Sequence, residues 1–390
     1  MVKPFQFARL PKIHFGCGKI AELPGIAKNY GDNILLVTGR SSFMNSIHGE
    51  NLLNALKDNN ISSYHVSIPG EPSPEMIDEA VANYRHININ AVIAVGGGSV
   101  LDAGKAISAM IYRTESVVDF LEGVGKGEHP GTKIPFVAIP TTSGTGSEAT
   151  KNAVISKIGK NGYKRSLRHD NFVPDIALVD PELTVQCPRD ITSASGMDCF
   201  TQLTEAFLSD KSNEYTDALS IEGLKAIKSS LTISYTDGGN IEARTGMAFA
   251  ALTSGICLAN SGLGVVHGFA SSIGGMYNIP HGLICGTLMA VSNEVNVRKL
   301  RKSGNNPAAL KKYAMLGKLF IDKKGKSDQY YTDGFINYLH SLAYELHLSG
   351  LRNYGLGEKD VELICSKTEI KNNPVKLAVE DLAEIVLRRL

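Results

Sequence analysis

The chain has 390 residues, of which 43% are hydrophobic and 20% charged, and its formal net charge is +1. A chain of this length favours two domains over one small core. The near-neutral balance excludes the bulk positive charge that attracts nucleic acid or anionic membranes, so we expect neither as a partner.

The cysteine pattern and the start of the chain indicate the compartment. The six cysteines form no CxxC pair and no disulfide-like framework, which is typical of reduced thiols in the cytosol. The first residues lack the apolar core of a signal peptide, and no apolar run of about 18 residues could span a bilayer. We therefore expect a cytoplasmic protein.

The first half alternates β-rich runs with helical stretches. The runs are NILLVTG (33–39), YHVSI (64–68), AVIAVGG (91–97), FVAIP (136–140) and IALVD (176–180). The segments between them are long enough for crossover connections. This pattern predicts a parallel sheet covered on both faces.

After about residue 186 the strand signal fades and helical periodicity replaces it, as in 213–231, 243–259 and 374–390. We therefore predict an α/β domain with a Rossmann-like parallel sheet over residues 1–185. An all-α domain over residues 186–390 follows it. No long linker separates the two halves, so the cleft between them is the expected active site.

A glycine turn in the first half is the first candidate binding feature. The run NAVIAVGGGSVLDAGKAI (90–107) is typical of a buried strand, a turn at Gly96, Gly97 and Gly98, and a helix. Glycines let the backbone approach a ligand closely, and the helix start offers unpaired N–H groups to a phosphate. Ser99 can add a hydroxyl donor. The pattern is not GxGxxG, and a purely structural turn is the alternative.

A second loop, IPTTSGTGSE (139–148), is rich in short hydroxyl side chains. Its alternative interpretation is an ordinary turn in which these hydroxyls satisfy their own backbone. The hydroxyl residues are Thr141, Thr142, Thr145 and Ser147.

Potential metal ligands lie in two segments of the second half. Asp198 and Gln202 are four residues apart in GMDCFTQLTEAF, which places them on one face of a helix. His267 lies in a helical stretch, and His281 follows a proline-marked break. Such donors suit Fe, Zn or Mn. The alternative is that His267 is a core histidine and Asp198 a capping or surface carboxylate, and spacing alone cannot bring the segments together.

Taken together, these motifs resemble the iron-containing (group III) alcohol dehydrogenase family in order and spacing over nearly the whole chain. The resemblance rests on GGGSVLDAGKA (96–106), IPTTSGTGSE (139–148), GMDCFTQLTEA (196–206) and the pair His267 and His281. It implies an NAD(P)-linked alcohol dehydrogenase or aldehyde reductase in which a divalent metal, Fe²⁺ or Zn²⁺ with Mn²⁺ as an alternative, polarises a small alcohol or aldehyde. It also implies a homodimer or higher homo-oligomer.

The resemblance also assigns roles to single residues. Asp198, His267 and His281 become the catalytic metal ligands, and Gln202 stands where the family commonly has a histidine. An amide oxygen is a weaker donor than imidazole, so Gln202 is a weak fourth ligand or only a neighbour. Ser271 replaces a family histidine near the nicotinamide, so the family's proton path does not carry over unchanged. The expected cofactor contacts are Gly96, Gly97, Gly98, Ser99, Asp102, Thr141, Thr142, Thr145, Ser147 and Lys164. For Lys164 the alternative is a solvated charge cluster on a loop or hairpin.

The end of the run 33–39 bears on the choice of cofactor. NAD-preferring members tend to have an acid there, which repels a 2′-phosphate. This chain has Gly39, Arg40 and Ser41 instead, so we expect NADP(H), with NAD as the alternative. The competing interpretation is that Arg40 points into solvent.

Two other functions stay open on the sequence alone. One is a lyase or cyclase of the dehydroquinate synthase kind, whose redox cycle is internal. The other is a degenerate, non-catalytic family member, which Gln202 and Ser271 keep open. The substrate is not specified, although Lys151, Arg165 and Arg168 are candidates for contacting an anionic aldehyde.

Overall fold

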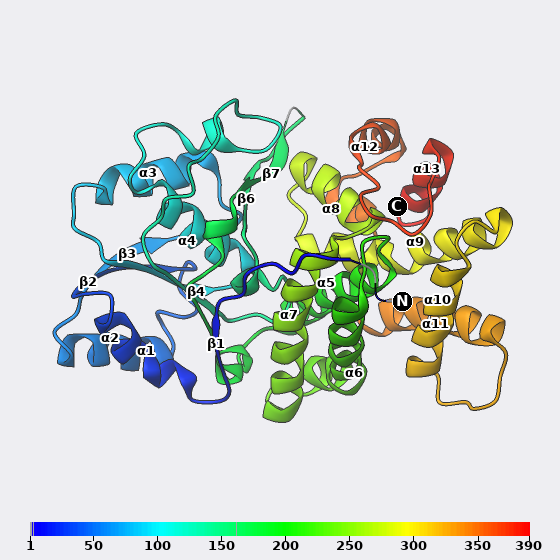
Figure 1. The fold of residues 1–390 in the computed structure, drawn as a ribbon, viewed down its shortest axis with the longest axis horizontal. Helices are drawn as coiled ribbons and strands as arrows, with labels where there is room; N and C mark the ends of the chain where they lie inside the picture. Colours follow the sequence, from blue (N-terminus) through cyan, green and yellow to red (C-terminus); the bar gives the residue numbers. More distant parts are fainter. Residues whose placement is uncertain (1, 3, 161) are drawn as a thin grey trace.

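A six-stranded parallel sheet organises the N-terminal half of the protein (Figure 1). A computed structural model describes residues 2, 4–160 and 162–390. All five predicted strands are present and pair in parallel, which confirms the predicted sheet. The sheet order is β1-β8-β5-β4-β2-β3, with β1 (Lys12–Phe15), β2 (Asn33–Thr38), β3 (Ser62–Ser67), β4 (Ala91–Gly96), β5 (Phe136–Pro140) and β8 (Ile176–Val179).

Side chains of the central strands alternate between two helical layers. Ile34 and Leu36 of β2 belong to the core beneath α1 (Leu23–Lys28) and α2 (Ile47–Asp58). Leu35 and Val37 face α3 (Pro74–Tyr84) and α4 (Gly98–Met110) on the other side (Figure 1). Both faces are therefore buried, which explains why the run is continuously apolar.

A separate antiparallel hairpin connects the two halves. It consists of β6 (Asn152–Lys157) and β7 (Tyr163–Arg168). β6 contacts α4 of the first half, and β7 contacts α8 (Val265–Met276) of the second (Figure 1). Lys164 lies on this hairpin, within a region that we expected to be a loop or hairpin.

The C-terminal half is helical, as predicted. Its last predicted segment, 374–390, forms a helix only from Val379, because the backbone N–H of Ala378 is capped by the Asp381 carboxylate at 2.8 Å. The helices are α5 (Arg189–Leu208), α6 (Glu214–Thr236), α7 (Ile241–Ser261), α8, α9 (His281–Ser303), α10 (Pro307–Phe320), α11 (Asp328–Glu345), α12 (Val361–Lys367) and α13 (Val379–Leu387).

Short 3₁₀ helices lie in the connections between the longer elements. They are η1 (Lys19–Glu22), η2 (Val117–Phe120), η3 (Ser147–Ala149), η4 (Asp170–Phe172), η5 (Pro181–Thr184), η6 (Leu351–Tyr354) and η7 (Glu358–Asp360). η5 lies between β8 and α5, so the boundary expected between residues 185 and 186 falls within this connection.

Helix α5 runs through the core of the helical half. Every residue from position 196 to 208 is buried, and the helix contacts α6, α7 and α9. The buried side chains include two carboxylates and an amide, those of Asp198, Glu205 and Gln202. Burying such groups is costly unless they are paired or coordinate a ligand, so their partners define the candidate site.

The start of the chain packs against the helical half. The segment before β1 runs across it (Figure 1), where the backbone N–H of Ala8 donates to Asn260 Oδ1 at 2.6 Å.

Among the described residues no single helix meets the length and hydropathy criteria for a membrane span. Only α7 and α8 taken as a pair do so, and they meet at 99°.

Candidate active site

Three predicted ligands converge from three different helices. Asp198 comes from α5, His267 from α8, and His281 is the first residue of α9, directly after Pro280. His267 Nε2 lies 3.2 Å from Asp198 Oδ1, and His281 Nε2 lies 3.7 Å from the same oxygen. The bend between α7 and α8 and the break at Pro280 bring the two sequence segments together.

A fourth donor, Cys285, belongs to the same cluster. It lies one helical turn after His281 on α9, is fully buried, and places its Sγ 3.7 Å from His267 Nε2. One ligand atom from each of Asp198, His267, His281 and Cys285 lies within 4.8 Å of the others. From the sequence we predicted only that the cysteines are reduced thiols. The signal that was missed is the i, i+4 spacing from His281 to Cys285.

Glu205 orients His267 from behind. Its carboxylate lies 2.7 Å from His267 Nδ1 and also accepts the backbone N–H of Val266 at 2.7 Å. Because Glu205 holds a proton on Nδ1, Nε2 is the ring nitrogen that is directed at the cluster and at Asp198. Glu205 was not predicted, because its role depends on how α5 packs against α8.

The ionisable groups of the cluster shift one another's pKa values. Burial acts to raise the pKa of Asp198, but the neighbouring His281 and His267 outweigh it, so the pKa lies below its usual value. Burial lowers the pKa of His281 to about 4 and raises that of Cys285 to about 12. His281 Nδ1 is buried and has no hydrogen-bond partner within the described part of the chain. Burial acts to lower the pKa of His267, but Cys285, Asp198 and Glu205 outweigh it and raise the pKa well above its usual value, so a metal ion would displace a proton from this ring. An ionised carboxylate and deprotonated imidazole nitrogens are the donor set that divalent metals bind.

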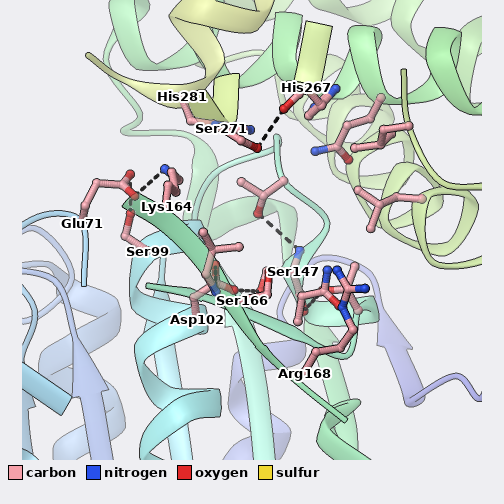
Figure 2. Close-up of a pocket in the computed structure, with 18 of the residues that line it drawn as sticks. Glu71, Ser99, Asp102, Ser147, Lys164, Ser166, Arg168, His267, Ser271 and His281 are labelled. Carbon is pink, nitrogen blue, oxygen red and sulfur yellow. Dashed lines mark hydrogen bonds and ion pairs between the residues drawn. The ribbon is translucent and has the colours of Figure 1, made fainter. Parts of the chain in front are cut away.

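Gln202 and Ser271, the two departures from the family pattern, have partners of their own. Gln202 lies on α5 and its Oε1 accepts a hydrogen bond from Ser254 Oγ at 2.9 Å. The Ser271 hydroxyl donates to the carbonyl oxygen of His267 at 2.9 Å (Figure 2). Both residues line the cavity described next, so neither is remote from the cluster.

A cavity of about 190 Å³ lies between the two halves (Figure 2). The helical half contributes His267, His281 and Gln202 to its wall, and the α/β half contributes Gly98 and Ser99 at the start of α4. The cavity therefore joins the metal-ligand cluster to the predicted phosphate-binding turn, in the cleft where the active site was expected.

The start of α4 is open toward ligands. Gly97 caps the helix without a side-chain hydrogen bond, so the first N–H groups stay available for an anion. Gly97 lines a second pocket of about 350 Å³ together with Thr141 and Thr142, whereas Gly98 lines the first pocket. The helix start thus contributes neighbouring residues to both pockets, as a dinucleotide spanning both would require.

Two of the three glycines are required by packing against protein atoms. A Cβ at Gly96 would lie 2.6 Å from Val100, and one at Gly98 would lie 2.6 Å from Thr145 Cγ2. At Gly97 the nearest atom, Thr142 Oγ1, lies 3.4 Å away, so this position has more room.

Asp102 and Ser147 belong to an internal network. Ser147 Oγ donates to Asp102 Oδ1 at 2.5 Å, and Asp102 Oδ2 accepts the N–H of Val154 at 3.1 Å. The buried Lys105 ammonium donates to Ser147 Oγ at 3.1 Å and to the carbonyl oxygen of Asn152 at 2.7 Å. Both predicted residues line the first pocket, but these contacts hold the loop that also carries Thr145.

Lys164 and Ser99 share an unpredicted partner, Glu71. Lys164 Nζ donates to Glu71 Oε2 at 2.6 Å, and Ser99 Oγ donates to Glu71 Oε1 at 3.1 Å (Figure 2). All three line the cavity, so a carboxylate stands between the two predicted cofactor contacts.

The residues expected to select the cofactor follow β2. Gly39 is half-buried, and its carbonyl oxygen accepts from Thr38 Oγ1 at 3.0 Å. Arg40 and Ser41 are exposed, and Arg40 makes no hydrogen bond or ion pair within residues 2, 4–160 and 162–390. The lining of the second pocket begins just beyond them, at Ser42.

Of the three basic candidates for an anionic substrate, only Arg168 lines the cavity, and it pairs with Glu122 at 3.1 Å. Lys151 pairs with Asp170 at 2.5 Å and Arg165 with Glu369 at 3.3 Å, both away from the cavity wall. Lys371, which was not predicted, lines the cavity and donates to the carbonyl oxygen of His267 at 3.2 Å.

Comparison with known proteins decides the family. The model for iron-containing alcohol dehydrogenase matches residues 11–181, and the model for the C-terminal domain of the Fe-containing alcohol dehydrogenase family matches residues 192–390. The chain belongs to the iron-containing alcohol dehydrogenase family.

Individual relatives agree with this assignment. The NAD-dependent methanol dehydrogenase of Bacillus methanolicus is 32% identical over 326 residues, 82% of each chain. The NADPH-dependent butanol dehydrogenase of Clostridium saccharobutylicum is 29% identical over 96% of each chain. The structure of an alcohol dehydrogenase from Oenococcus oeni matches with a TM-score of 0.87 and 27% identity, covering 99% of this chain and 100% of that one. This oxidoreductase family is favoured over the lyase or cyclase alternative.

Proposed function

We propose that this iron-containing alcohol dehydrogenase family member transfers hydride between NADP(H) and a small alcohol or aldehyde, at a divalent metal held by Asp198, His267 and His281. One observation carries the proposal. His267 and His281 line the same cavity as Gly98 at the start of α4, so a metal and a nicotinamide cofactor would meet there. Positioning the two reactants in one site supplies much of the catalytic advantage of such enzymes.

Each of the proposed metal-binding residues has a separate role. A divalent ion in this cluster supplies Lewis-acid polarisation of the substrate oxygen. Asp198 contributes negative charge, and His267 and His281 contribute neutral nitrogen donors. Glu205 holds the His267 ring in place, a kind of support whose loss typically costs about 10–100-fold in metal affinity or activity.

The cofactor-binding residues act at the other side of the cavity. The open N–H groups at the start of α4 bind the pyrophosphate, and Thr141 and Thr142 line the adjacent second pocket. Hydride chemistry belongs to the nicotinamide itself. The relatives named above include one NAD-dependent and one NADPH-dependent enzyme. Gly39 and Arg40 favour NADP(H) for this chain, with NAD as the alternative.

The test combines metal analysis with turnover. Protein reloaded with Fe²⁺, Zn²⁺ or Mn²⁺ should retain one ion per chain and reduce small aldehydes with NADPH. His267→Ala should lose both properties, since it removes a ligand from a fully buried cluster. Wild-type protein that retains none of the three metals by elemental analysis would contradict the proposal.

A further inference from the structure

We propose that Cys285 binds the active-site metal as a thiolate, as the fourth protein ligand in place of Gln202. The proposal rests on the proposed function, since it assumes that Asp198, His267 and His281 hold a divalent ion. It adds a sulfur donor to a site whose predicted ligands are oxygen and nitrogen only.

The spacing of the four donor atoms fits four protein ligands around one ion, which would take the substrate oxygen as a fifth ligand. Metal bonds of about 2.0–2.3 Å hold nitrogen and oxygen ligands about 3.3 Å apart and nitrogen and sulfur ligands about 3.6 Å apart. The observed separations are 3.2 Å from His267 Nε2 to Asp198 Oδ1, and 3.7 Å from Cys285 Sγ to His267 Nε2. His281 Nε2 lies 3.7 Å from Asp198 Oδ1. The remaining pairs of donor atoms lie within 4.8 Å of each other, so the side chains must draw together for all four atoms to reach bonding distance.

Gln202 is poorly placed to compete for this position. Its Oε1, the atom that would bind a metal, accepts a hydrogen bond from Ser254 Oγ at 2.9 Å. An amide oxygen is also a weaker donor than a thiolate for Zn²⁺, Co²⁺ or Fe²⁺. Cys285 is fully buried beside His267, so its sulfur faces the cluster and not solvent.

Binding of the ion by Cys285 forms a metal–sulfur bond and releases a proton. The ion takes a sulfur lone pair, the S–H bond breaks, and the proton passes to solvent, because a coordinating thiol is deprotonated outright. Asp198 and the thiolate together neutralise the charge of a divalent ion. Sulfur also shifts the preference of the site toward Zn²⁺ and Co²⁺ and away from Mn²⁺.

Cobalt substitution tests the proposal by spectroscopy instead of by activity. Full-length wild-type protein loaded with one Co²⁺ should show a near-ultraviolet thiolate-to-cobalt charge-transfer band. Cys285→Ser should lose the band and bind Co²⁺ more than about 100-fold more weakly, since losing even an outer partner costs about 10–100-fold. Cys257→Ser is the matched control, because Cys257 is equally buried but contacts Ser220 and Thr216 on α6. It should keep the band.

A second measurement needs only wild-type protein. X-ray absorption of the zinc-loaded enzyme should show one sulfur neighbour at about 2.3 Å. Two results would contradict a role for Cys285 as a ligand: stoichiometric metal with only nitrogen and oxygen neighbours, or a cobalt band that survives in Cys285→Ser. Either result would still be consistent with a metal held by Asp198, His267 and His281. Failure of the wild type to bind any ion overturns both proposals.

Discussion

At the scale of single residues, the proposed metal cluster combines predicted and unpredicted side chains. Asp198, His267 and His281 could be predicted, because carboxylate and imidazole groups in two motifs are recognisable from the sequence. Cys285 and Glu205 could not, because their proximity to His267 arises only when α8 and α9 pack against α5. Chemical type is thus readable from the sequence, whereas the contacts between helices are not.

Gln202→His should tighten metal retention, because imidazole binds these ions more strongly than an amide. The measurement is the rate at which a chelator strips metal from the variant and from the wild type. Ser254→Ala serves as the control, since it removes the hydrogen bond to Gln202 without adding a donor. Equal stripping rates for Gln202→His and wild type would show that position 202 does not reach the metal.

At the scale of elements, the start of α4 is the proposed cofactor site. The glycine turn was readable because a buried strand, three glycines and a helix follow one another. The reason for each glycine was not, since Gly96 and Gly98 are restricted by Val100 and Thr145 across the turn. The link that Glu71 makes between Ser99 and Lys164 could not be predicted either, because it depends on how distant segments pack.

Gly98→Ala should weaken nucleotide binding. The added Cβ would lie 2.6 Å from Thr145 Cγ2, so the loop must shift. Overpacking of this kind costs about 1–3 kcal/mol, which raises the dissociation constant for NADPH about five- to hundredfold if the strain falls on the binding loop. The dissociation constant is measured by fluorescence titration with NADPH. The control is Gly25→Ala on α1, where a new Cβ meets nothing within 4 Å. Unchanged binding in Gly98→Ala would show that the turn does not contact the nucleotide.

Glu148, in η3, should make stability depend on pH. Burial raises the pKa of this carboxyl from 4.5 to about 7, so the folded state binds its proton more tightly than the unfolded state does. The stabilisation is complete below about pH 4.5 and is lost as the pH rises through 7. Urea unfolding at pH 5 and 7.5 should therefore show that Glu148→Gln gains stability relative to wild type at the higher pH. A difference between the two proteins that stays constant over this range would contradict the assignment.

At the scale of the whole molecule, the division into a parallel sheet and a helical half followed from the sequence, because strands buried on both faces give continuous apolar runs. β1 was missed, since its four residues form a half-exposed edge strand without such a run. The hairpin of β6 and β7 was only partly anticipated. It matters because β7 carries Lys164 to the cavity between the halves.

NADPH should be favoured over NADH by about five- to hundredfold in kcat/KM, because Arg40 is free to pair with a 2′-phosphate beside Gly39. Gly39→Asp should reverse the preference by placing a carboxylate there. The substitution has room, since a Cβ at Gly39 would meet only Val100 Cγ2, at 3.9 Å. Equal kcat/KM values for NADH and NADPH in the wild type would contradict this role and indicate that Arg40 is only a solvated surface residue.

The transfer of label from cofactor to product tests the central claim most directly. Metal-loaded wild-type protein is given a small aldehyde and NADPH carrying deuterium at the reactive C4 position, and the alcohol is analysed by mass spectrometry. Deuterium should appear on the alcohol carbon in a one-to-one ratio with NADPH oxidised, and His267→Ala should give none. Metal-loaded wild-type protein that transfers no deuterium to any member of a panel of small aldehydes would contradict hydride transfer at this site.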